Sequence, residues 1–262
     1  MEQNPLSGLL ASKRGLIVGV ANKNSIAWAI ARKLAAAGME LAFTYQGEAL
    51  KGRVEKTVAE LGDDVPLFEM DVQNDEHIGR VFADLGERWG KLDFLLHSVA
   101  YAPKETFTSP FVDTTREAYL TAHDVSAYSL VALTRGAVPL MADGGSVVAM
   151  SYHAAERVVL GYNLMGVAKA SLEACVKYLA ANLGEKNIRV NAISAGALNT
   201  LAARGIPQFR TLMNHGTEMS PLGRPIEPDE VGDAGLFLAS DLSTAITGEI
   251  MYVDAGVNIM AG

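Results

Sequence analysis

Two tyrosines and one lysine fall within residues 151–169, and together they could do acid chemistry. Tyr162 and Lys169 are seven residues apart, which is about two turns of helix, so both side chains would lie on one face. An ammonium group that faces the same pocket as a phenol favours the phenolate and lowers the pKa of the phenol. Tyr152 belongs to the same stretch. The spacing alone is equally consistent with a half-buried tyrosine and a solvated lysine on an ordinary helix.

The flanking sequence indicates the elements that must position these residues. Residues 146–150 (S-V-V-A-M) form an apolar run that is typical of a buried strand. From Tyr162 onward, apolar residues recur at helical spacing: Leu164, Ala168, Leu172 and Val176. The candidate acid pair therefore lies just after a buried strand, on the helix that follows it.

Apolar runs and helical patterns alternate along the whole chain. Most of the runs are continuous rather than alternating, which is typical of parallel strands buried on both faces. Because crossover connections are right-handed almost without exception, we predict an α/β fold. It would be a single doubly wound, Rossmann-type parallel sheet with helices on both faces, in one domain over residues 1–262. Strands are expected at residues 15–20, 41–45, 65–70, 94–99, 146–150, 189–194 and 249–253, and helices at 26–37, 48–61, 78–89, 116–141, from 162 onward, and 228–239.

Ligands bind such sheets at the carboxyl ends of the strands, and this chain has small or polar residues there: Gly19, Asp71, Ser98, Ser151 and Ser194. The first strand, its glycine and the following helix are the parts of a phosphate cradle. G-x-G-x-x-G is absent, however, and a structural turn explains Gly19 equally well. Asp71 could accept a hydrogen bond from an adenine amino group, or it could mark the entry to a helix. We interpret the five positions together as one extended site.

Residues 198–224 mix apolar side chains with glycine and proline. The segment is too irregular for one long helix and too apolar for a free loop. A small lid that packs over a bound substrate explains both features. A surface helix that stays docked explains them equally well.

Composition limits the classes of function. The chain has 262 residues, of which 49% are hydrophobic and 20% charged, as in an ordinary globular protein with a large core. A net charge of −8 argues against nucleic acid as the main partner. Cys175 is the only cysteine, which favours a reduced, cytoplasmic setting. No apolar stretch resembles a signal peptide or a membrane span. We therefore expect a cytoplasmic protein with no membrane partner, and we predict no metal site.

Short motifs spread over essentially the whole chain carry a family resemblance. The chain resembles the short-chain dehydrogenase/reductase superfamily, and within it the divergent branch of bacterial and plastid enoyl-acyl-carrier-protein reductases. Ordinary members of the superfamily have Tyr-x-x-x-Lys. Here no tyrosine has a lysine four residues on, and only Tyr162 has one seven residues on, as in the enoyl-reductase branch. The motifs are G-V-A-x-x-x-S-I-A (19–27), A-F-T-Y-Q (42–46), D-V (71–72), H-S-V-A-Y-A-P (97–103), S-Y with Y-N-L-M-G-V-A-K (151–169), R-V-N-A-I-S-A-G (189–196) and V-D-A-G (253–256).

The resemblance implies NADH-dependent reduction of the trans-2 double bond of enoyl thioesters on acyl carrier protein, in fatty acid synthesis. It implies that Tyr162 donates to the enolate oxygen, that Lys169 holds the nicotinamide-ribose hydroxyls, and that Tyr152 is a second tyrosine at the pocket. Ala102 would lie near the acyl thioester. The implied cofactor contacts are Gly19, Ser25 and Ile26 at the pyrophosphate, Gln46, Asp71 and Val72 at the adenosine, and Val99, Lys169, Leu198, Asn199, Thr200, Leu201 and Ala202 elsewhere along the cofactor.

The chain departs from the family pattern at positions that the resemblance places around the substrate. These departures leave the acyl chain length and the inhibitor sensitivity open, while the reaction type stands. Family members are commonly homotetramers, and the apolar residues 257–260 are compatible with a subunit contact. The departing residues are Ala100, His153, Ala154, Leu160, Gly161, Ala197 and Asn199.

No arginine follows residues 44–46 to pair with a 2′-phosphate, which favours NADH over NADPH. Lys51 and Arg53 follow soon after, so the strictness of this preference stays open. Two other functions also stay open. One is a different short-chain reductase that acts on a carbonyl or on a non-carrier-bound enoyl compound. The other is a non-catalytic NAD(H)-sensing module, against which the Tyr162/Lys169 pair counts.

Overall fold

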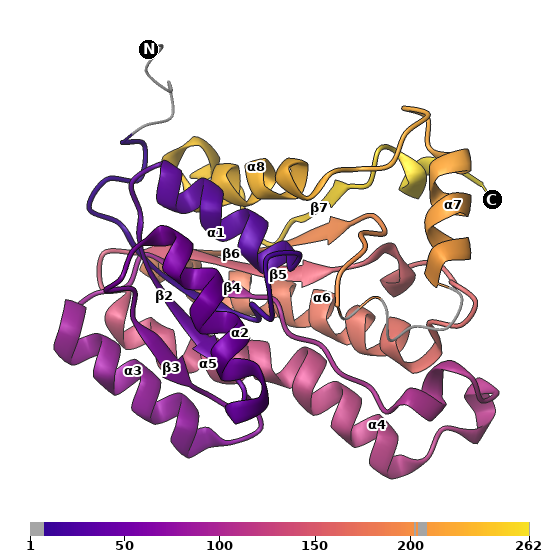
Figure 1. Cartoon of the computed structure of the whole chain (residues 1–262), viewed down its shortest axis with the longest axis horizontal. Helices are drawn as coiled ribbons and strands as arrows, with labels where there is room; N and C mark the ends of the chain where they lie inside the picture. The colour runs from indigo at the N-terminus through magenta and orange to yellow at the C-terminus, as the bar shows by residue number, and fades with distance from the viewer. Residues whose placement is uncertain (1–7, 202, 204–208, 262) are drawn as a thin grey trace.

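The computed structural model describes residues 8–201, 203 and 209–261, and Figure 1 shows a central sheet among helices. The sheet has seven strands in the order β3-β2-β1-β4-β5-β6-β7, and every neighbouring pair is parallel. The chain starts in the middle, winds outward to β3, and then returns beside β1 to build the other half. This is the doubly wound α/β fold that was predicted. The strands are β1 Arg14–Val18, β2 Glu40–Tyr45, β3 Leu67–Glu69, β4 Phe94–His97, β5 Gly145–Ser151, β6 Ile188–Ala195 and β7 Ile250–Val253.

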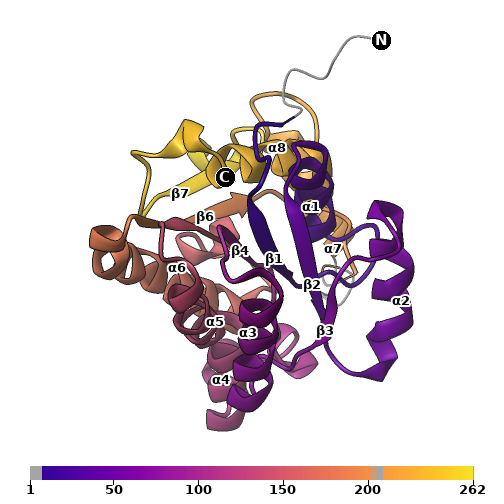
Figure 2. The same cartoon turned by 90° about the vertical axis from the view of Figure 1, so that its left-hand side faces the viewer.

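Helices cover both faces of the sheet (Figure 2). One hydrophobic cluster joins the strands to α1, α2 and α8, through side chains such as Trp28 and Val231. A second cluster joins them to α3, α5 and α6, through side chains such as Val81 and Leu172. The helices are α1 Ile26–Ala36, α2 Glu48–Val58, α3 Asp75–Trp89, α4 Arg116–His123, α5 Ser129–Ala137, α6 Asn163–Leu183, α7 Phe209–Met219 and α8 Pro228–Ala239.

Local sequence decides where several helices begin and end. Asn74 caps α3 because its side-chain oxygen accepts from the N–H groups of Glu76 and His77, at 2.9 and 3.2 Å. Gly90 ends α3 in the left-handed conformation, with φ of 68°. The last helix begins at a proline, as helices often do, and α8 has the predicted bounds.

The single helix expected over residues 116–141 is wrong. The chain forms α4, then a wide π-helical turn at Asp124–Tyr128, then α5 and a 3-10 turn at Val138–Leu140. Two buried serines anchor the wide turn. Ser126 exchanges hydrogen bonds with the backbone of Tyr101, while the Ser129 hydroxyl donates to the Val125 carbonyl at 2.7 Å. A helical pattern in the sequence cannot reveal such a turn, because a distant loop holds it in place.

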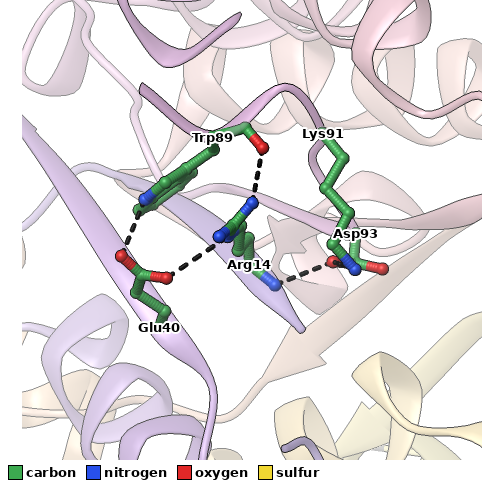
Figure 3. A network of polar contacts seen from close by, with 5 residues as sticks. All are labelled: Arg14, Glu40, Trp89, Lys91 and Asp93. Atoms are coloured by element: carbon green, nitrogen blue, oxygen red, sulfur yellow. Dashed lines mark hydrogen bonds and ion pairs between the residues drawn. The ribbon is translucent and has the colours of Figure 1, made fainter. Parts of the chain in front are cut away.

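Polar contacts close the amino edge of the sheet (Figure 3). The Arg14 guanidinium donates to Glu40 at 3.2 Å and to the Trp89 carbonyl, and the Trp89 indole donates to Glu40 at 2.7 Å. The Arg14 backbone N–H donates to Asp93 at 2.8 Å, and Lys91 pairs with Asp93 at 3.4 Å. These contacts join β1, β2, the end of α3 and the start of β4. The opposite, carboxyl edge is therefore left to bind ligands.

Gly19 lies where the chain leaves β1 at the carboxyl edge. Its φ is +113°, a conformation that residues with a side chain rarely adopt. A Cβ atom at this position would lie 2.1 Å from the carbonyl oxygen of Ser98, which follows β4. Only a glycine therefore lets the two central strands pass so close to one another as they end.

We expect Gly19→Ala to destabilise the fold through this backbone clash. The matched control is Gly62→Ala, because Gly62 also has a positive φ of +138° but nothing within 4 Å of its added Cβ. The control isolates the backbone strain, which costs about 1–3 kcal/mol. Gly19→Ala should lower the free energy of unfolding by about 1–3 kcal/mol more than Gly62→Ala does. Urea denaturation of the two variants measures this difference. Equal losses in the two variants would contradict the close approach at Ser98.

Candidate active site

The carboxyl ends of the central strands form one continuous edge. In the parallel register Val18 lies beside His97, and Ser151 lies beside Ser194. Asp71 follows the edge strand β3, two residues beyond Glu69. The predicted strand-end positions therefore share this edge, from Asp71 at one side to Ser194 at the other. An extended ligand can lie across it.

Tyr162 stands at the first turn of α6, as its N-cap residue. Its ring lies 5.0 Å from the ring of Tyr152, centroid to centroid, at an angle of 58°. On another side Phe107 meets it edge-on at 6.4 Å and 66°. The structure thus brings together the two tyrosines that the sequence proposed, and it adds Phe107 as a third aromatic neighbour.

The next residue, Asn163, fixes the start of α6 against the loop after β4. Its side-chain amide donates to the carbonyls of Thr106 and Ser109, each at 3.1 Å. Its backbone has a positive φ of 41°, which asparagine tolerates better than most residues. The loop over residues 101–114 contains 3-10 turns, and these bonds tie it directly beside Tyr162.

The pKa of Tyr162 moves in the opposite direction to the one expected from sequence. Burial raises the pKa of this phenol well above its ordinary value, and the neighbouring Tyr152 raises it further. Lys169 is not among the groups that shift it. Burial also raises the pKa of Tyr152, to about 12. Both phenols therefore stay protonated at neutral pH, which suits a hydrogen-bond or proton donor.

Lys169 is buried, with 5% of its surface exposed, and its Nζ donates to the Met150 carbonyl at 2.6 Å. Burial lowers the pKa of this ammonium to about 8, and the carboxylate of Glu173 opposes the shift. The solvated-lysine alternative is therefore wrong. An ammonium has three donors, so the bond to Met150 leaves two for a ligand.

The turn between β1 and α1 fits the pyrophosphate of a dinucleotide. The Ser25 hydroxyl accepts from the N–H groups of Ala21 and Asn22, at 3.0 and 3.2 Å, and so shapes the turn. Among the described residues, no side chain caps α1, and its first turn carries no acidic residue. The N–H groups of Trp28 and Ala29 donate to the Ser25 carbonyl, so those of Ile26 and Ala27 are the ones that can face an anion. The turn can thus bind phosphate groups as a glycine-rich loop does, with Gly19 as its one glycine.

Two buried polar atoms near the same edge lack a hydrogen-bond partner within the described part of the chain. They are the Ser194 hydroxyl oxygen and Nδ1 of His97. Nε2 of His97 lies 2.7 Å from the Ser129 hydroxyl, and burial lowers the pKa of this imidazole to about 3, with Lys169 adding to the shift. An unpartnered hydroxyl at the end of β6 fits a ligand with many hydroxyls, as a dinucleotide has.

The residues predicted for the adenosine end follow neighbouring strands. Gln46 is exposed directly after β2, and the chain after β3 lies beside it, since the N–H of Met70 donates to the Tyr45 carbonyl at 2.8 Å. Asp71 does not start α3. Its carboxylate accepts from the Gln73 N–H at 3.0 Å within a turn. Val72 and Val99 pack against one hydrophobic cluster below this edge.

Ala102 is buried in a small cluster with Leu164 and Met165, against which Tyr162 and Phe107 pack. The predicted substrate contact and the predicted proton donor therefore lie in one cluster. This is the outcome expected if Ala102 borders the reacting end of the substrate.

Local hydrogen bonds fix the conformation of the start of the predicted lid. Leu198 is buried, and its carbonyl accepts from the N–H of Thr200 at 2.8 Å. The Thr200 hydroxyl in turn accepts from the N–H of Ala203 at 3.1 Å. Asn199 and Leu201 are exposed on this segment, whereas Ala202 lies outside the described residues.

Most of the remaining lid segment is the helix α7, while residues 204–208 lie outside the described part of the chain. A cavity of about 670 Å³ separates α7 from Tyr152, the loop at residues 157–160 and the C-terminal residues 257–261. Figure 1 shows α7 beside the C-terminus. Three of the departures from the family pattern line this cavity: His153, Leu160 and Ala197.

Two further findings concern possible ligands and surroundings. Within the described residues, no three His, Cys, Asp or Glu side chains come together in a way that could hold a metal ion. Over the same residues, the model contains no helix with the length and apolar character that crossing a membrane requires.

Sequence reasoning missed Phe107, Asn163 and Glu173. Phe107 and Asn163 act through the fold of the loop after β4, which no local pattern reveals. Glu173 had a signal, because it stands four residues after Lys169 and therefore on the same helix face.

Comparison with known proteins assigns the family. A family model described as Enoyl-(Acyl carrier protein) reductase matches residues 19–258. The enoyl-acyl-carrier-protein reductase (NADH) FabI of Rickettsia felis is 48% identical over 254 residues, 97% of each chain. The Anaplasma phagocytophilum reductase, solved in complex with NAD, has a TM-score of 0.94 at 44% identity and covers 98% of this chain and 97% of its own. The Bacillus cereus reductase, solved with NADP⁺ and indole naphthyridinone, has a TM-score of 0.92 at 44% identity, with 97% and 99% covered. This chain belongs to the enoyl-acyl-carrier-protein reductase family.

Proposed function

We propose that this protein uses NADH to reduce the trans-2 double bond of enoyl thioesters carried on acyl carrier protein, a step of fatty acid synthesis. One observation carries the proposal: the Tyr162/Lys169 pair stands just after β5 in a chain that matches this reductase family over residues 19–258. The seven-residue spacing separates this chain from reductases with Tyr-x-x-x-Lys, which act on carbonyls.

NADH, when bound, supplies the hydride for the β-carbon of the substrate. Negative charge then develops on the thioester oxygen, and a donor must meet it. Tyr162 fits this role because burial keeps its phenol protonated. Ala102 borders the same cluster and would contact the acyl thioester. The tilted ring of Tyr152 and the edge-on ring of Phe107 restrict the orientation of Tyr162.

Lys169 holds the nicotinamide-ribose hydroxyls with the donors that Met150 leaves available. The pyrophosphate lies at the start of α1, and the adenosine lies across the ends of β2 and β3. The residues proposed to contact NADH are Gly19, Ser25, Ile26, Gln46, Asp71, Val72, Val99, Lys169, Leu198, Asn199, Thr200, Leu201 and Ala202.

We further propose a cytoplasmic homotetramer that receives its substrate from acyl carrier protein. Two separate groups of exposed apolar side chains support this assembly. Val112 and Leu120, at α4 and the turn before it, are 89% and 60% exposed, whereas Ile259 and Met260 near the C-terminus are 74% and 46% exposed. A tetramer with dihedral symmetry needs at least two different interfaces on each subunit, and these two groups could provide them.

The proposed function is tested by following the loss of NADH absorbance with enoyl thioesters of graded length, on acyl carrier protein and on coenzyme A. We expect turnover with crotonyl and longer enoyl thioesters, and none with an acetoacetyl thioester. Turnover of the acetoacetyl thioester alone would instead identify a carbonyl reductase. Binding of NADH without turnover of any thioester would identify a sensing module.

Substitutions of Tyr162 and of Lys169 should have different effects on turnover and on NADH binding. Tyr162→Phe should lower turnover roughly ten- to a thousandfold, the scale for loss of one acid or oxyanion donor, with little change in NADH affinity. Lys169→Ala should weaken NADH binding as well as turnover, and Lys169→Arg should restore function only in part. NADH fluorescence and the crotonyl-thioester rate measure the two effects separately. Near-native rates in both variants would show that Tyr152 or another group donates the proton.

NADH should be preferred over NADPH. Lys51, the first cation after β2, pairs with Glu48 at 3.4 Å and lies 5.9 Å over the ring of Tyr45, so its charge is already partly neutralised. We expect a higher kcat/KM with NADH, and we expect Glu48→Gln to narrow the difference by freeing Lys51 for the 2′-phosphate. The reverse preference in the unaltered protein would contradict this reading.

We propose that α7 moves as a lid about its C-terminal junction. That junction is anchored, because the Ser220 hydroxyl donates to the Ala255 carbonyl at 2.9 Å and Arg224 donates twice to Glu230, at 2.6 and 3.0 Å. Limited proteolysis within residues 198–216 should slow when NADH and an acyl analogue are both bound. Equal cleavage rates in the free and ternary states would show a helix that stays docked.

A further inference from the structure

Glu173 is a buried carboxylate for which the proposed reaction has no step. It lies on α6, and only 5% of its surface is exposed. The Ser151 hydroxyl donates to its Oε1 at 2.5 Å, and Ser151 is itself 6% exposed at the end of β5. Burial raises the pKa of this carboxyl, while the Ser151 hydrogen bond and the cations of Lys177 and Lys169 lower it and so favour the ionised form. A buried ionised group destabilises the fold unless other charges and hydrogen bonds compensate it. Its presence directly behind the active-site edge therefore needs a cause.

The geometry links Glu173 to Lys169. The two residues are four apart on α6, so their side chains leave the same face of the helix. Both reach the end of β5 at successive residues, since Lys169 donates to the Met150 carbonyl at 2.6 Å and Glu173 accepts from Ser151. The end of β5 therefore anchors both side chains at successive residues, without a direct ion pair between them in the described part of the chain.

The other described ionisable groups around Lys169 and Glu173 do not supply Lys169 with a negative charge. From β4, His97 faces Lys169, but burial keeps this imidazole neutral at ordinary pH. Lys177 on α6, Glu156 in the loop after β5, and Tyr252 on β7 all face Glu173 rather than Lys169. Among the described residues, Glu173 is the one group that counteracts the effect of burial on the pKa of the Lys169 ammonium.

We propose that Glu173 is a positioning residue, whose buried negative charge keeps the Lys169 ammonium protonated and ready to hold the cofactor. The inference rests on the proposed function for the identity of the cofactor. The pKa of Lys169, about 8 with this carboxylate present, would fall further without it. A larger share of Lys169 would then be neutral at pH 7 to 8. Glu173 thus acts on the cofactor only through Lys169.

The test is the pH dependence of NADH binding in Glu173→Gln, a variant that removes the charge but keeps an oxygen to accept from Ser151. In the unaltered protein, affinity should weaken as pH rises through the pKa of Lys169, because the cation is the binding form. Glu173→Gln should move this midpoint down by about one pH unit or more, the usual effect of a nearby opposite charge. At pH 8 this shift corresponds to a loss of roughly fivefold in affinity.

Glu156→Gln is the matched control, because it removes the same charge from an exposed neighbour that does not act on Lys169. Its midpoint should not fall, because Glu156 raises the pKa of Glu173 and its loss favours the ionised carboxylate. Ser151→Ala leaves Glu173 in place but removes the bond that favours its ionised form, and it should move the midpoint in the same direction by less. If Glu173→Gln does not fold, Ser151→Ala decides the question.

A readout without cofactor comes from carbon-13 NMR of labelled lysine Cε atoms in the free protein. The Lys169 signal is identified by its loss in Lys169→Arg, and its titration midpoint should fall in Glu173→Gln. An unchanged midpoint, or an equal fall in Glu156→Gln, overturns the proposal. Neither measurement involves turnover, so a protein that fails to reduce thioesters yet shows the shift would contradict the proposed function and leave this inference standing.

Discussion

The hydrogen bond from Lys169 to the Met150 carbonyl is the contact on which the active-site edge depends. It fastens the second turn of α6 to the end of β5, and it takes a cation out of water to do so. Because Tyr162 is the N-cap residue of α6, the same bond helps to set where the phenol stands relative to the sheet. The electrostatics follow from this placement, since burial keeps the phenol protonated and lowers the pKa of the ammonium to about 8. The chemistry that is proposed for the site needs a protonated phenol and a charged lysine. Burial favours the protonated phenol but disfavours the charged lysine, which Glu173 helps to keep protonated.

Three contacts with distant parts of the chain complete this edge. Asn163 holds the loop after β4 against the start of α6, and the wide turn at Asp124–Tyr128 presents its buried serines to the same loop and to His97. Gly19 brings the ends of β1 and β4 together. At the amino edge, by contrast, a polar network joins β1, β2, the end of α3 and the start of β4 (Figure 3). The two edges of one sheet therefore have different tasks, one structural and one chemical.

Much of this structure could be predicted from sequence because the strands are continuous apolar runs and the connections obey a single handedness. The doubly wound parallel sheet and its shared carboxyl edge follow from those two facts. The meeting of Tyr152 with Tyr162 was predicted from their common stretch and from the family resemblance. The break in the helix at Asp124–Tyr128 could not be predicted, since serine hydrogen bonds to another segment produce it. The pKa of Tyr162 was misjudged because spacing reports which face a side chain occupies, and burial depends on everything that packs around it. Glu173 lay within reach of a four-residue spacing rule, but its meaning emerged only once Lys169 was seen to be buried.

In the proposed reaction, hydride reaches the β-carbon of an enoyl thioester while the protein provides the proton. The most direct measurement is mass spectrometry and NMR of the product formed from a crotonyl thioester and NADH deuterated at both C4 positions, in ordinary water. We expect a butyryl thioester with one deuterium, located on C3, and an ordinary hydrogen added at C2. Deuterium on C2, or a crotonyl thioester that remains unreduced while NADH is bound, would contradict it.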